Sequence, residues 1–346
     1  MDRENRTEKR KSEHIDIVLN REVTGKRITT GFERYRFRHE ALPEISFSQI
    51  SLKTTFLGKP QRTPFLISSM TGGTKRARLI NFHLAEAAQA RGWAMGLGSM
   101  RAALEHPEIA DTFQVRRYAP DIPLFTNLGA VQLNYGYGTD HCKRIVELAE
   151  ADGLILHLNS MQEVFQPEGD TDFRHLFRRI EDVCRTLGVP VGVKEVGWGI
   201  HGELARRLYE AGVAFVDVAG AGGTSWSQVE KFRSRDELAT AAAEAFTDWG
   251  LPTADCILDV RRHAPDSPLI ASGGVMHGVD GAKALALGAD MAGFGRSLLQ
   301  AADSDSPEAI ARQLERIERE FQIAMFGIGV SQIDELKGTE RMIRIE

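Results

Sequence analysis

Two glycine-rich segments near the end of the chain have the composition of a phosphate-binding site. They are Ser272-Gly273-Gly274-Val275 and Gly293-Phe294-Gly295-Arg296. Because glycine lacks a side chain, backbone N–H groups in such turns can approach a phosphate oxygen closely. One Gly-Gly pair alone usually marks only a tight turn. Two such segments, each at the end of an apolar run, favour a phosphate cradle.

Other polar residues whose side chains could bind a ligand or take part in catalysis also end apolar runs. Residues 157–163 (His-Leu-Asn-Ser-Met-Gln-Glu) bring an imidazole, two amides and a carboxylate together. Lys194 ends another run, where a buried cation needs a negative partner. That partner could be a strand-end carboxylate in a structural ion pair. The alternative, which we favour, is an electron-rich cofactor ring whose reduced, anionic form the lysine would stabilise.

These side chains must be positioned by an alternation of apolar runs and helical segments. The runs span residues 64–70, 93–99, 123–129, 153–159, 189–196, 214–220, 268–274 and 289–295. Helices are expected at residues 81–91, 107–118, 139–151, 172–187, 202–211, 254–263 and 279–287, and after the last run. Short continuous apolar runs are typical of buried parallel strands.

Eight strand–helix units predict an α/β fold, the (β/α)8 TIM barrel, whose active sites lie at the carboxyl ends of the strands. The rival architecture is an open, doubly wound sheet. It fits less well because the first strand is not followed by the Gly-x-Gly-x-x-Gly fingerprint of dinucleotide-binding sheets.

The chain divides into an N-terminal extension, residues 1–60, and the barrel with a C-terminal tail, residues 61–346. The extension contains a strand-like piece at residues 27–30. Two further segments lie outside the regular strand–helix units. Residues 221–252, after the sixth strand, are too many for a routine loop and predict a lid or binding loop. The residues from Gly327 onward are expected to cap the barrel or to reach a neighbouring subunit.

Composition limits the classes of partner. Lys and Arg number 43 against 48 Asp and Glu, a net charge of −5 that gives no support to nucleic-acid binding. Cys142, Cys184 and Cys256 are widely spaced, as expected of reduced thiols. The charged N-terminus lacks the apolar core of a signal peptide, and no long apolar stretch predicts a membrane span. We therefore expect a cytoplasmic protein.

Taken together, these segments resemble the FMN-binding barrel oxidoreductases and, within them, the type 2 isopentenyl diphosphate isomerases. The matching pieces are Lys194, both glycine segments, Arg10-Lys11-x-x-His14, Met70-Thr71-Gly72-Gly73, Gly98-Ser99-x-Arg101, residues 157–163 and Gly222-Gly223-Thr224. The resemblance covers about residues 10–336, and residues 157–163 are its most specific part. The chain departs from the usual pattern at Met100, Ser160 and Ala219, and the last change removes one hydroxyl contact to a flavin.

The resemblance implies a role for each site residue. It implies FMN contacts at Ser69, Met70, Thr71, Ser99, Asn127, Lys194, Thr224, Gly273, Gly274, Gly295 and Arg296. It implies diphosphate contacts at Arg10, Lys11, His14, Arg101 and His157, with Asn159 and Gln162 near the substrate and a Mg2+ carboxylate at Glu163. A diphosphate carries several negative charges and needs such a set of cations and a metal. By spacing alone, Arg10 and Lys11 would be solvated, His14 would be a surface histidine, and Glu163 would be an ordinary helix-start carboxylate.

The implied reaction interconverts isopentenyl diphosphate and dimethylallyl diphosphate in isoprenoid biosynthesis. A proton is added at the terminal alkene carbon and another is lost beside the CH2–O group, so no net redox occurs. The resemblance implies reduced FMN as the acid–base group, NADPH as reductant, and a homo-oligomer, a tetramer or octamer. Gln162 is the candidate catalytic residue that relays or orients a proton. Trp226 is either a wall that excludes water or an ordinary packing residue.

Other functions fit the residues less well. A 2-hydroxy acid oxidase on the same barrel would carry His-Gly-Gly-Arg after the sixth strand, to remove a proton and hold a carboxylate. Residues 221–224 are Ala-Gly-Gly-Thr and lack both groups. An IMP dehydrogenase-type enzyme would place a cysteine there, and the chain has none at that point. A non-catalytic flavin- or phosphate-binding regulator would not need the polar side chains of residues 157–163.

Overall fold

Eight parallel strands close into a barrel, which confirms the predicted (β/α)8 fold. The computed structural model describes residues 3–303 and 306–345. The strands follow one another around the barrel in chain order, and the last pairs with the first. They are β4 (Phe65–Ile67), β5 (Ala94–Gly96), β6 (Leu124–Gly129), β7 (Gly153–His157), β8 (Val191–Lys194), β9 (Phe215–Asp217), β10 (Leu269–Ala271) and β11 (Met291–Phe294). Their side chains are buried almost throughout, as expected of strands covered by helices.

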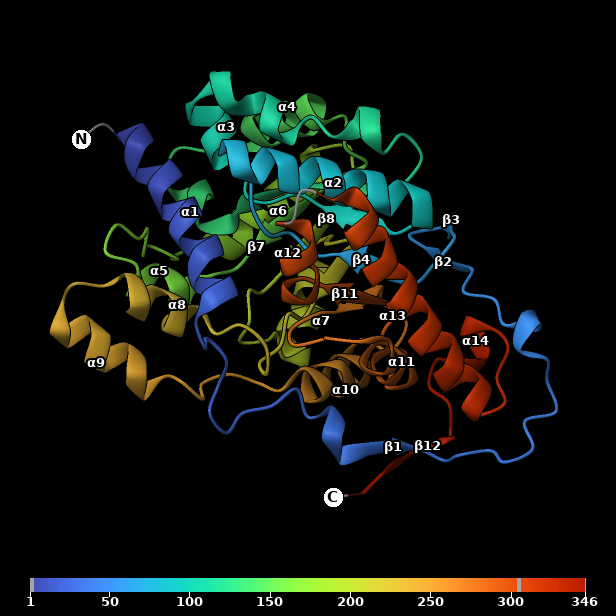
Figure 1. Cartoon of the computed structure of the whole chain (residues 1–346). Helices are drawn as coiled ribbons and strands as arrows, with labels where there is room; N and C mark the ends of the chain where they lie inside the picture. The colour runs from blue at the N-terminus through green and yellow to red at the C-terminus, as the bar shows by residue number, and fades with distance from the viewer. Residues whose placement is uncertain (1–2, 304–305, 346) are drawn as a thin grey trace.

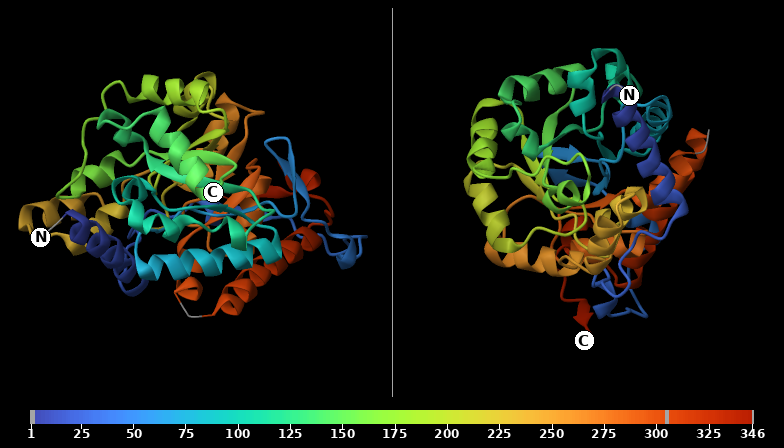
Figure 2. Two further views of the ribbon diagram at one scale, coloured as in Figure 1. Left: turned by 90° about the horizontal axis from the view of Figure 1, so that it is seen from above. Right: turned by 90° about the vertical axis from the view of Figure 1, so that its left-hand side faces the viewer.

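A ring of helices surrounds the strands, as the right-hand view of Figure 2 shows. The helices are α2 (Lys75–Arg91), α3 (Arg101–Glu105), α4 (Thr139–Ala149), α5 (Ser160–Phe165), α6 (Leu176–Thr186), α7 (Gly202–Glu210), α10 (Thr253–His263), α11 (Gly278–Ala286), α12 (Arg296–Ala302) and α13 (Pro307–Gly327). Helix α2 starts earlier than residue 81 because the Thr74 side chain caps it, accepting a hydrogen bond from the N–H of Ala77 at 3.0 Å.

The prediction of a helix at residues 107–118 is wrong. This stretch forms two short 3-10 segments, η3 (Pro107–Phe113) and η4 (Arg116–Tyr118). Phe113 and Val115 are both fully buried although they are two residues apart. Positions two apart on an α-helix face different directions, so a regular helix could not bury both against the same core.

A hairpin from the N-terminal extension closes the amino end of the barrel. Strands β2 (Thr54–Phe56) and β3 (Lys59–Gln61) pair in antiparallel fashion. Phe56 packs edge-on against Phe215, with ring centroids 5.6 Å apart. A small core forms here from Phe56, Leu66, Ala94, Phe125, Ile155, Phe215, Ile270 and Met291. The expected boundary between residues 60 and 61 therefore lies inside a hairpin that shares a core with the barrel.

The strand expected at residues 27–30 is not present. The Asp248 carboxylate accepts hydrogen bonds from the backbone N–H groups of Lys26, Arg27 and Ile28, at 2.7, 2.8 and 3.1 Å. A side chain thus satisfies the donors that a neighbouring strand would otherwise bind. Farther on come η1 (Phe32–Arg34), β1 (Tyr35–Phe37) and η2 (Phe47–Gln49).

The C-terminal tail pairs with the extension of its own chain. After α14 (Ile333–Leu336), strand β12 (Met342–Arg344) pairs in antiparallel fashion with β1, well away from the N-terminus in Figure 1. The tail does not cap the mouth of the barrel, which was one of its two expected roles. Within the described parts of the chain, no helix is both long and apolar enough to cross a membrane.

The charged N-terminal residues form a helix, α1 (Arg3–Asn20), which the sequence analysis did not predict within the N-terminal extension. In Figure 1 it runs beside α8 (Trp226–Arg233) and α12, and it contacts both. Ile15 and Val18 are its buried apolar side chains. Arg76 bridges the helix to the barrel by binding Asp16 and Asp303, each at 2.6 Å. The segment 221–252 holds α8 and α9 (Glu237–Ala245) rather than an unstructured loop.

We predict that Glu318→Ala lowers the free energy of unfolding by about 1–3 kcal/mol, as expected when a buried donor loses its partner. Glu318 on α13 is buried, pairs with Arg91 and accepts a hydrogen bond from the indole N–H of fully buried Trp93 at 2.8 Å. Urea denaturation measures the change. Glu315→Ala, an exposed carboxylate on the same helix, is the control. Equal stability of the two variants would contradict the anchoring role of Glu318.

Candidate functional site

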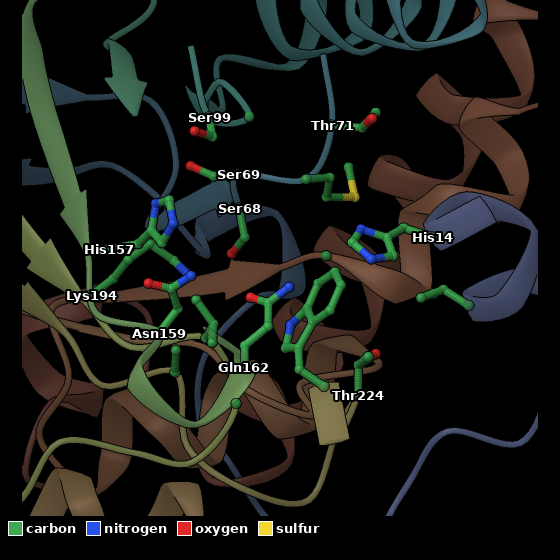
Figure 3. Close-up of a pocket in the computed structure, with 18 of the residues that line it drawn as sticks. His14, Ser68, Ser69, Thr71, Ser99, His157, Asn159, Gln162, Lys194 and Thr224 are labelled. Atoms are coloured by element: carbon green, nitrogen blue, oxygen red, sulfur yellow. The ribbon is translucent and has the colours of Figure 1, made fainter. Parts of the chain in front are cut away.

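One cavity of about 450 Å³ opens at the carboxyl ends of the barrel strands. Loops after the strands form its floor and sides, and helix α1 forms part of its wall. Every residue assigned a site role from the sequence lines it: Arg10, Lys11, His14, Ser69, Met70, Thr71, Ser99, Arg101, Asn127, His157, Asn159, Gln162, Glu163, Lys194, Thr224, Gly273, Gly274, Gly295 and Arg296. In the view of Figure 3, His157 and Lys194 lie on one side, His14 and Thr224 on the other, and Gln162 between them.

The glycine segments form a backbone cradle with no room for side chains. Gly273 has φ +97°, and a Cβ added there would lie 2.1 Å from the carbonyl oxygen of Gly220. A Cβ on Gly223 would lie 2.5 Å from the backbone nitrogen of Gly274. The hydroxyl of Ser68 at the cavity floor has no hydrogen-bond partner within the described residues. This cradle and its unpartnered polar atom fit a bound phosphate-bearing cofactor such as FMN.

A chain of hydrogen bonds links side chains at the carboxyl ends of β4, β6 and β7. His157 Nδ1 lies 2.7 Å from Asn127 Oδ1, and the Asn127 amide donates to Ser69 Oγ at 3.2 Å. Burial, together with the nearby charge of Lys194, lowers the pKa of His157 to about 3. The imidazole is therefore neutral near pH 7 and donates through Nδ1. His157 brings no positive charge to the cavity in this state, so any diphosphate contact from it rests on a neutral ring.

Lys194 is buried and has acidic neighbours. Its ammonium group donates a hydrogen bond to the backbone carbonyl of Glu195 at 2.6 Å. Burial lowers the pKa of Lys194, whereas Asp217 and Glu195 oppose that shift. Asp217 stands beside Lys194 in the register of β8 and β9, and one of its carboxylate oxygens has no hydrogen-bond partner within the described residues. Lys194 therefore lines the cavity and has buried acidic neighbours, but no ion pair of Lys194 is present within the described residues, and its role toward a cofactor ring stays a prediction.

Glu195 is a buried carboxylate with a clear role that the sequence reading missed. Its Oε2 accepts the backbone N–H groups of residues 196–199, at 2.7, 2.7, 2.5 and 3.3 Å. This fixes the turn after β8, whose Val196 and Gly197 line the cavity. Burial raises the pKa of Glu195 to about 7, although the backbone donors oppose the rise. An acidic residue directly after a strand-end lysine was the available signal in the sequence.

A cluster of cations lines the opposite part of the cavity. Lys11 lies over the Phe113 ring at 5.5 Å and donates to the carbonyl of Ser99 at 3.5 Å. Arg101 on α3 pairs with Glu105 at 2.9 Å and with Asp170 at 2.8 Å, and Arg10 lies 3.9 Å from Glu168. Burial, followed by the charge of Arg10, lowers the pKa of Lys11 to about 7. The cations are crowded enough to repel one another, so an anionic ligand would relieve that repulsion.

Glu230 on α8 is another residue that the sequence reading missed. It is almost fully buried and accepts from His14 Nε2 at 3.0 Å and from the Gln162 amide at 3.4 Å. Burial raises the pKa of its carboxyl, but His14 and Arg233 lower it, and the net shift is downward. Trp226 lines the cavity and packs edge-on against the His14 ring at 5.1 Å, so it serves both as wall and as packing residue. Only the fold brings residues 14, 162 and 230 together.

Glu163 is the one carboxylate that the sequence assigned to a metal. Its oxygens accept hydrogen bonds from the Asn159 amide and from the backbone N–H of Asp170, both at 2.7 Å. Burial raises the pKa of Glu163, and these hydrogen bonds oppose the rise. The described residues contain no group of three or more His, Cys, Asp or Glu side chains placed to hold a metal. A Mg2+ ion here would take most of its oxygens from water and from a bound anion, as this ion commonly does.

Comparisons with known proteins agree with this geometry. The model of the FMN-dependent dehydrogenase family matches residues 3–121 and 141–344. An isopentenyl-diphosphate delta-isomerase from Oceanobacillus iheyensis is 54% identical over 333 residues, covering 96% of this chain and 95% of that protein. One from Nostoc sp. is 50% identical over 340 residues, with coverages of 98% and 97%. The chain belongs to the type 2 isopentenyl-diphosphate isomerase family.

Solved structures similar to this family member show the fold alone. A lactate oxidase from Pediococcus acidilactici has a TM-score of 0.70 at 19% identity and covers 99% of this chain and 94% of its own. A soluble mutant of (S)-mandelate dehydrogenase from Pseudomonas putida has a TM-score of 0.68 at 17% identity, with 99% coverage of both chains. Identities this low carry no argument about the reaction, whereas the isomerase relatives are about half identical over nearly the whole chain.

We predict that Gly273→Ala weakens FMN binding by more than about tenfold, because the new Cβ is strained at positive φ and meets the backbone of Gly220. FMN titration followed by flavin fluorescence measures the dissociation constant. Gly188→Ala is the control, since Gly188 has φ +82° but no neighbour within 4 Å of an added Cβ. Equal FMN affinity in both folded variants would contradict the cradle.

We also predict that binding of Mg2+–pyrophosphate becomes weaker relative to a Lys11→Arg variant as pH rises above about 7. The pKa of Lys11 is lowered to about 7, so above that pH the free protein must take up a proton to present a cation. The ratio of the two affinities should change by up to about tenfold per pH unit. Calorimetric titration from pH 6 to 9 measures it, and the ligand's own titration affects both proteins equally. A ratio independent of pH would contradict the shift.

Proposed function

We propose that this protein interconverts isopentenyl diphosphate and dimethylallyl diphosphate, with reduced FMN as its cofactor. The observation that carries the proposal is a single cavity lined by two separate groups of residues that each suit an anion. One is the glycine cradle after β10 and β11, and the other is the cation cluster of Arg10, Lys11 and Arg101. One site suits the phosphate of FMN and the other suits a substrate diphosphate. The half-identical isomerase relatives support the same assignment.

The FMN site in this proposal uses residues from most of the strand ends. They are Ser69, Met70, Thr71, Ser99, Asn127, Lys194, Thr224, Gly273, Gly274, Gly295 and Arg296. Lys194 would face the electron-rich part of the ring and stabilise its reduced, negatively charged state. When bound, reduced FMN would supply an acid–base group at N5 and a negative charge that stabilises a developing substrate cation. NADPH is the proposed reductant.

The substrate site uses the other half of the cavity. Arg10, Lys11, His14 and Arg101 would hold the diphosphate, while neutral His157 could add a hydrogen bond. Glu163 would bind Mg2+ together with the diphosphate oxygens. Asn159 and Gln162 would lie near the hydrocarbon end, and Gln162 would orient or relay a proton there. Trp226, Ile15 and Val18 line the same cavity and would exclude water from a tertiary cation.

The cellular setting follows from the same proposal. The reaction belongs to isoprenoid biosynthesis, and we propose a cytoplasmic homo-oligomer, a tetramer or octamer, with no nucleic-acid or membrane partner. The net charge of −5 gives no support to a nucleic-acid partner. The three cysteines are free thiols in the described structure, in keeping with a reducing compartment.

Anaerobic NMR tests the function directly. The protein is incubated with isopentenyl diphosphate and Mg2+, with either reduced or oxidised FMN. Dimethylallyl diphosphate should appear only with reduced FMN. A flavin-loaded protein that forms no product under either condition would contradict the isomerase assignment. Oxidation of lactate or mandelate by the same preparation would instead support the 2-hydroxy acid oxidase alternative.

We predict that Gln162→Ala lowers kcat by at least about 100-fold, the usual scale for losing a group that positions a proton. FMN should stay bound, because Gln162 lies outside the glycine cradle. Steady-state kinetics and the flavin absorbance of the purified variant test this. Gln114→Ala, on the exposed surface, serves as control. A Gln162→Ala variant with near-normal kcat would remove Gln162 from the mechanism.

A further inference from the structure

Asp170 lies directly behind the cavity wall, in the turn that follows α5. It does not itself line the cavity, and about a fifth of its side chain is exposed (20%). One of its carboxylate oxygens, Oδ2, accepts hydrogen bonds from Arg101 Nη1 at 2.8 Å and from the Gln132 amide at 3.0 Å. Its backbone N–H donates to Glu163 Oε2 at 2.7 Å. All three of these partners line the cavity.

The partners of Asp170 belong to three consecutive units of the barrel. Arg101 begins α3 after β5, Gln132 lies in η5 (Ala130–Asn134) after β6, and Glu163 lies in α5 after β7. A backbone hydrogen bond from the N–H of Met100 to the carbonyl of Asn127, at 2.8 Å, joins the first two units beside Arg101. Asp170 adds a direct polar link between the Arg101 cation and the Glu163 carboxylate.

The turn that carries Asp170 is itself tightly placed. The N–H of Gly169 donates to the carbonyl of Gln166 at 3.0 Å. A Cβ on Gly169 would lie 1.8 Å from the carbonyl oxygen of Glu163, so the turn rests directly on the backbone of α5. A close backbone fit of this kind fixes where the Asp170 side chain and N–H point.

We propose that Asp170 is the positioning residue of the substrate diphosphate site, because its carboxylate binds Arg101 and its backbone N–H binds Glu163, which would contact the diphosphate and its Mg2+. The proposal rests on the proposed function for the identity of the anion. The Asp170 side chain orients the guanidinium of Arg101 and offsets the repulsion between Arg101 and the cations on α1. Its backbone orients the carboxylate that would bind the metal. Residues that orient ligand-binding side chains in this way commonly change affinity or activity by about 10–100-fold when replaced.

The test compares Asp170→Ala, Asp170→Asn and Asp172→Ala in the FMN-loaded protein. Asp172 lies two residues away in the same loop, and its carboxylate pairs only with exposed Arg174 among the described contacts. Asp172→Ala thus makes the same chemical change without touching the cavity wall. Calorimetry with inorganic pyrophosphate and Mg2+ gives affinity, and steady-state kinetics with isopentenyl diphosphate give KM and kcat.

Asp170→Ala should weaken pyrophosphate binding and raise KM by about tenfold or more, with kcat changed less than about threefold. Asp170→Asn keeps an acceptor oxygen but loses the charge, so its effect should be smaller and in the same direction. Asp172→Ala should match the wild type. If Asp170→Ala fails to fold, Asp170→Asn decides the question, since it has the same shape.

Two outcomes would overturn the proposal. One is pyrophosphate affinity in the Asp170 variants equal to that of Asp172→Ala. The other is a fall in both FMN affinity and kcat while KM stays unchanged, which would mark a purely structural role of Asp170. Failure of the proposed function looks different: the wild type would bind pyrophosphate in an Asp170-dependent manner but would not isomerise isopentenyl diphosphate.

Discussion

Crowded positive charge in a partly buried cavity is the interaction on which this site depends. Arg10, Lys11 and Arg101 approach one another closely enough for the first and last to depress the pKa of the lysine, after burial itself. Such a cluster would be unstable without nearby carboxylates. Glu168 and Asp170 supply them from a single turn. Neither of these two carboxylates lines the cavity, whereas Glu105, which pairs with Arg101 at 2.9 Å, does.

Arg10 and Lys11 belong to α1, a helix outside the barrel, so the cation cluster forms only if α1 is held against the barrel. The ion pair between Arg76 and Asp16 is partly exposed, and such a pair contributes only about 0–1 kcal/mol. Burying Ile15 and Val18 contributes more, about 1.5–3 kcal/mol for each side chain. The hydrogen bond of His14 to buried Glu230 adds a directional contact. Apolar packing therefore holds α1 in place, and the polar contacts fix its orientation.

The sequence predicts the barrel and the strand-end residues of the cavity well, because both follow from local patterns. Only the family resemblance, and no local pattern, indicates that Arg10, Lys11 and His14 line the cavity. Apolar runs mark the strands, and the fold rule that sites lie at the carboxyl ends of strands identifies Lys194, Gly273 and their neighbours. The misses are long-range. Nothing near residues 27–30 indicates that Asp248 would bind their N–H groups, and nothing near Glu230 indicates that His14 would reach it. Such contacts depend on loop paths that local periodicity does not encode.

The helix formed by the charged N-terminus is a second feature that local sequence patterns do not predict. Its few apolar residues give no clear amphipathic pattern and predict no helix, yet residues 3–20 form a helix that packs against α8 and α12. Tertiary contacts thus override weak local signals here. Residue identities at the site could be inferred from the sequence, whereas the partners that orient them, Glu195, Glu230 and Asp170, could not.

The central claim is that the cavity supports a proton shift with no net redox, and isotope incorporation tests it most directly. The reaction is run anaerobically in D2O with isopentenyl diphosphate, Mg2+ and reduced FMN, and is followed by NMR and by flavin absorbance. A proton shift without net redox should place deuterium in the methyl group formed from the terminal alkene carbon and leave the flavin reduced at the end. Oxidation of the flavin in proportion to product, or product without deuterium, would contradict it.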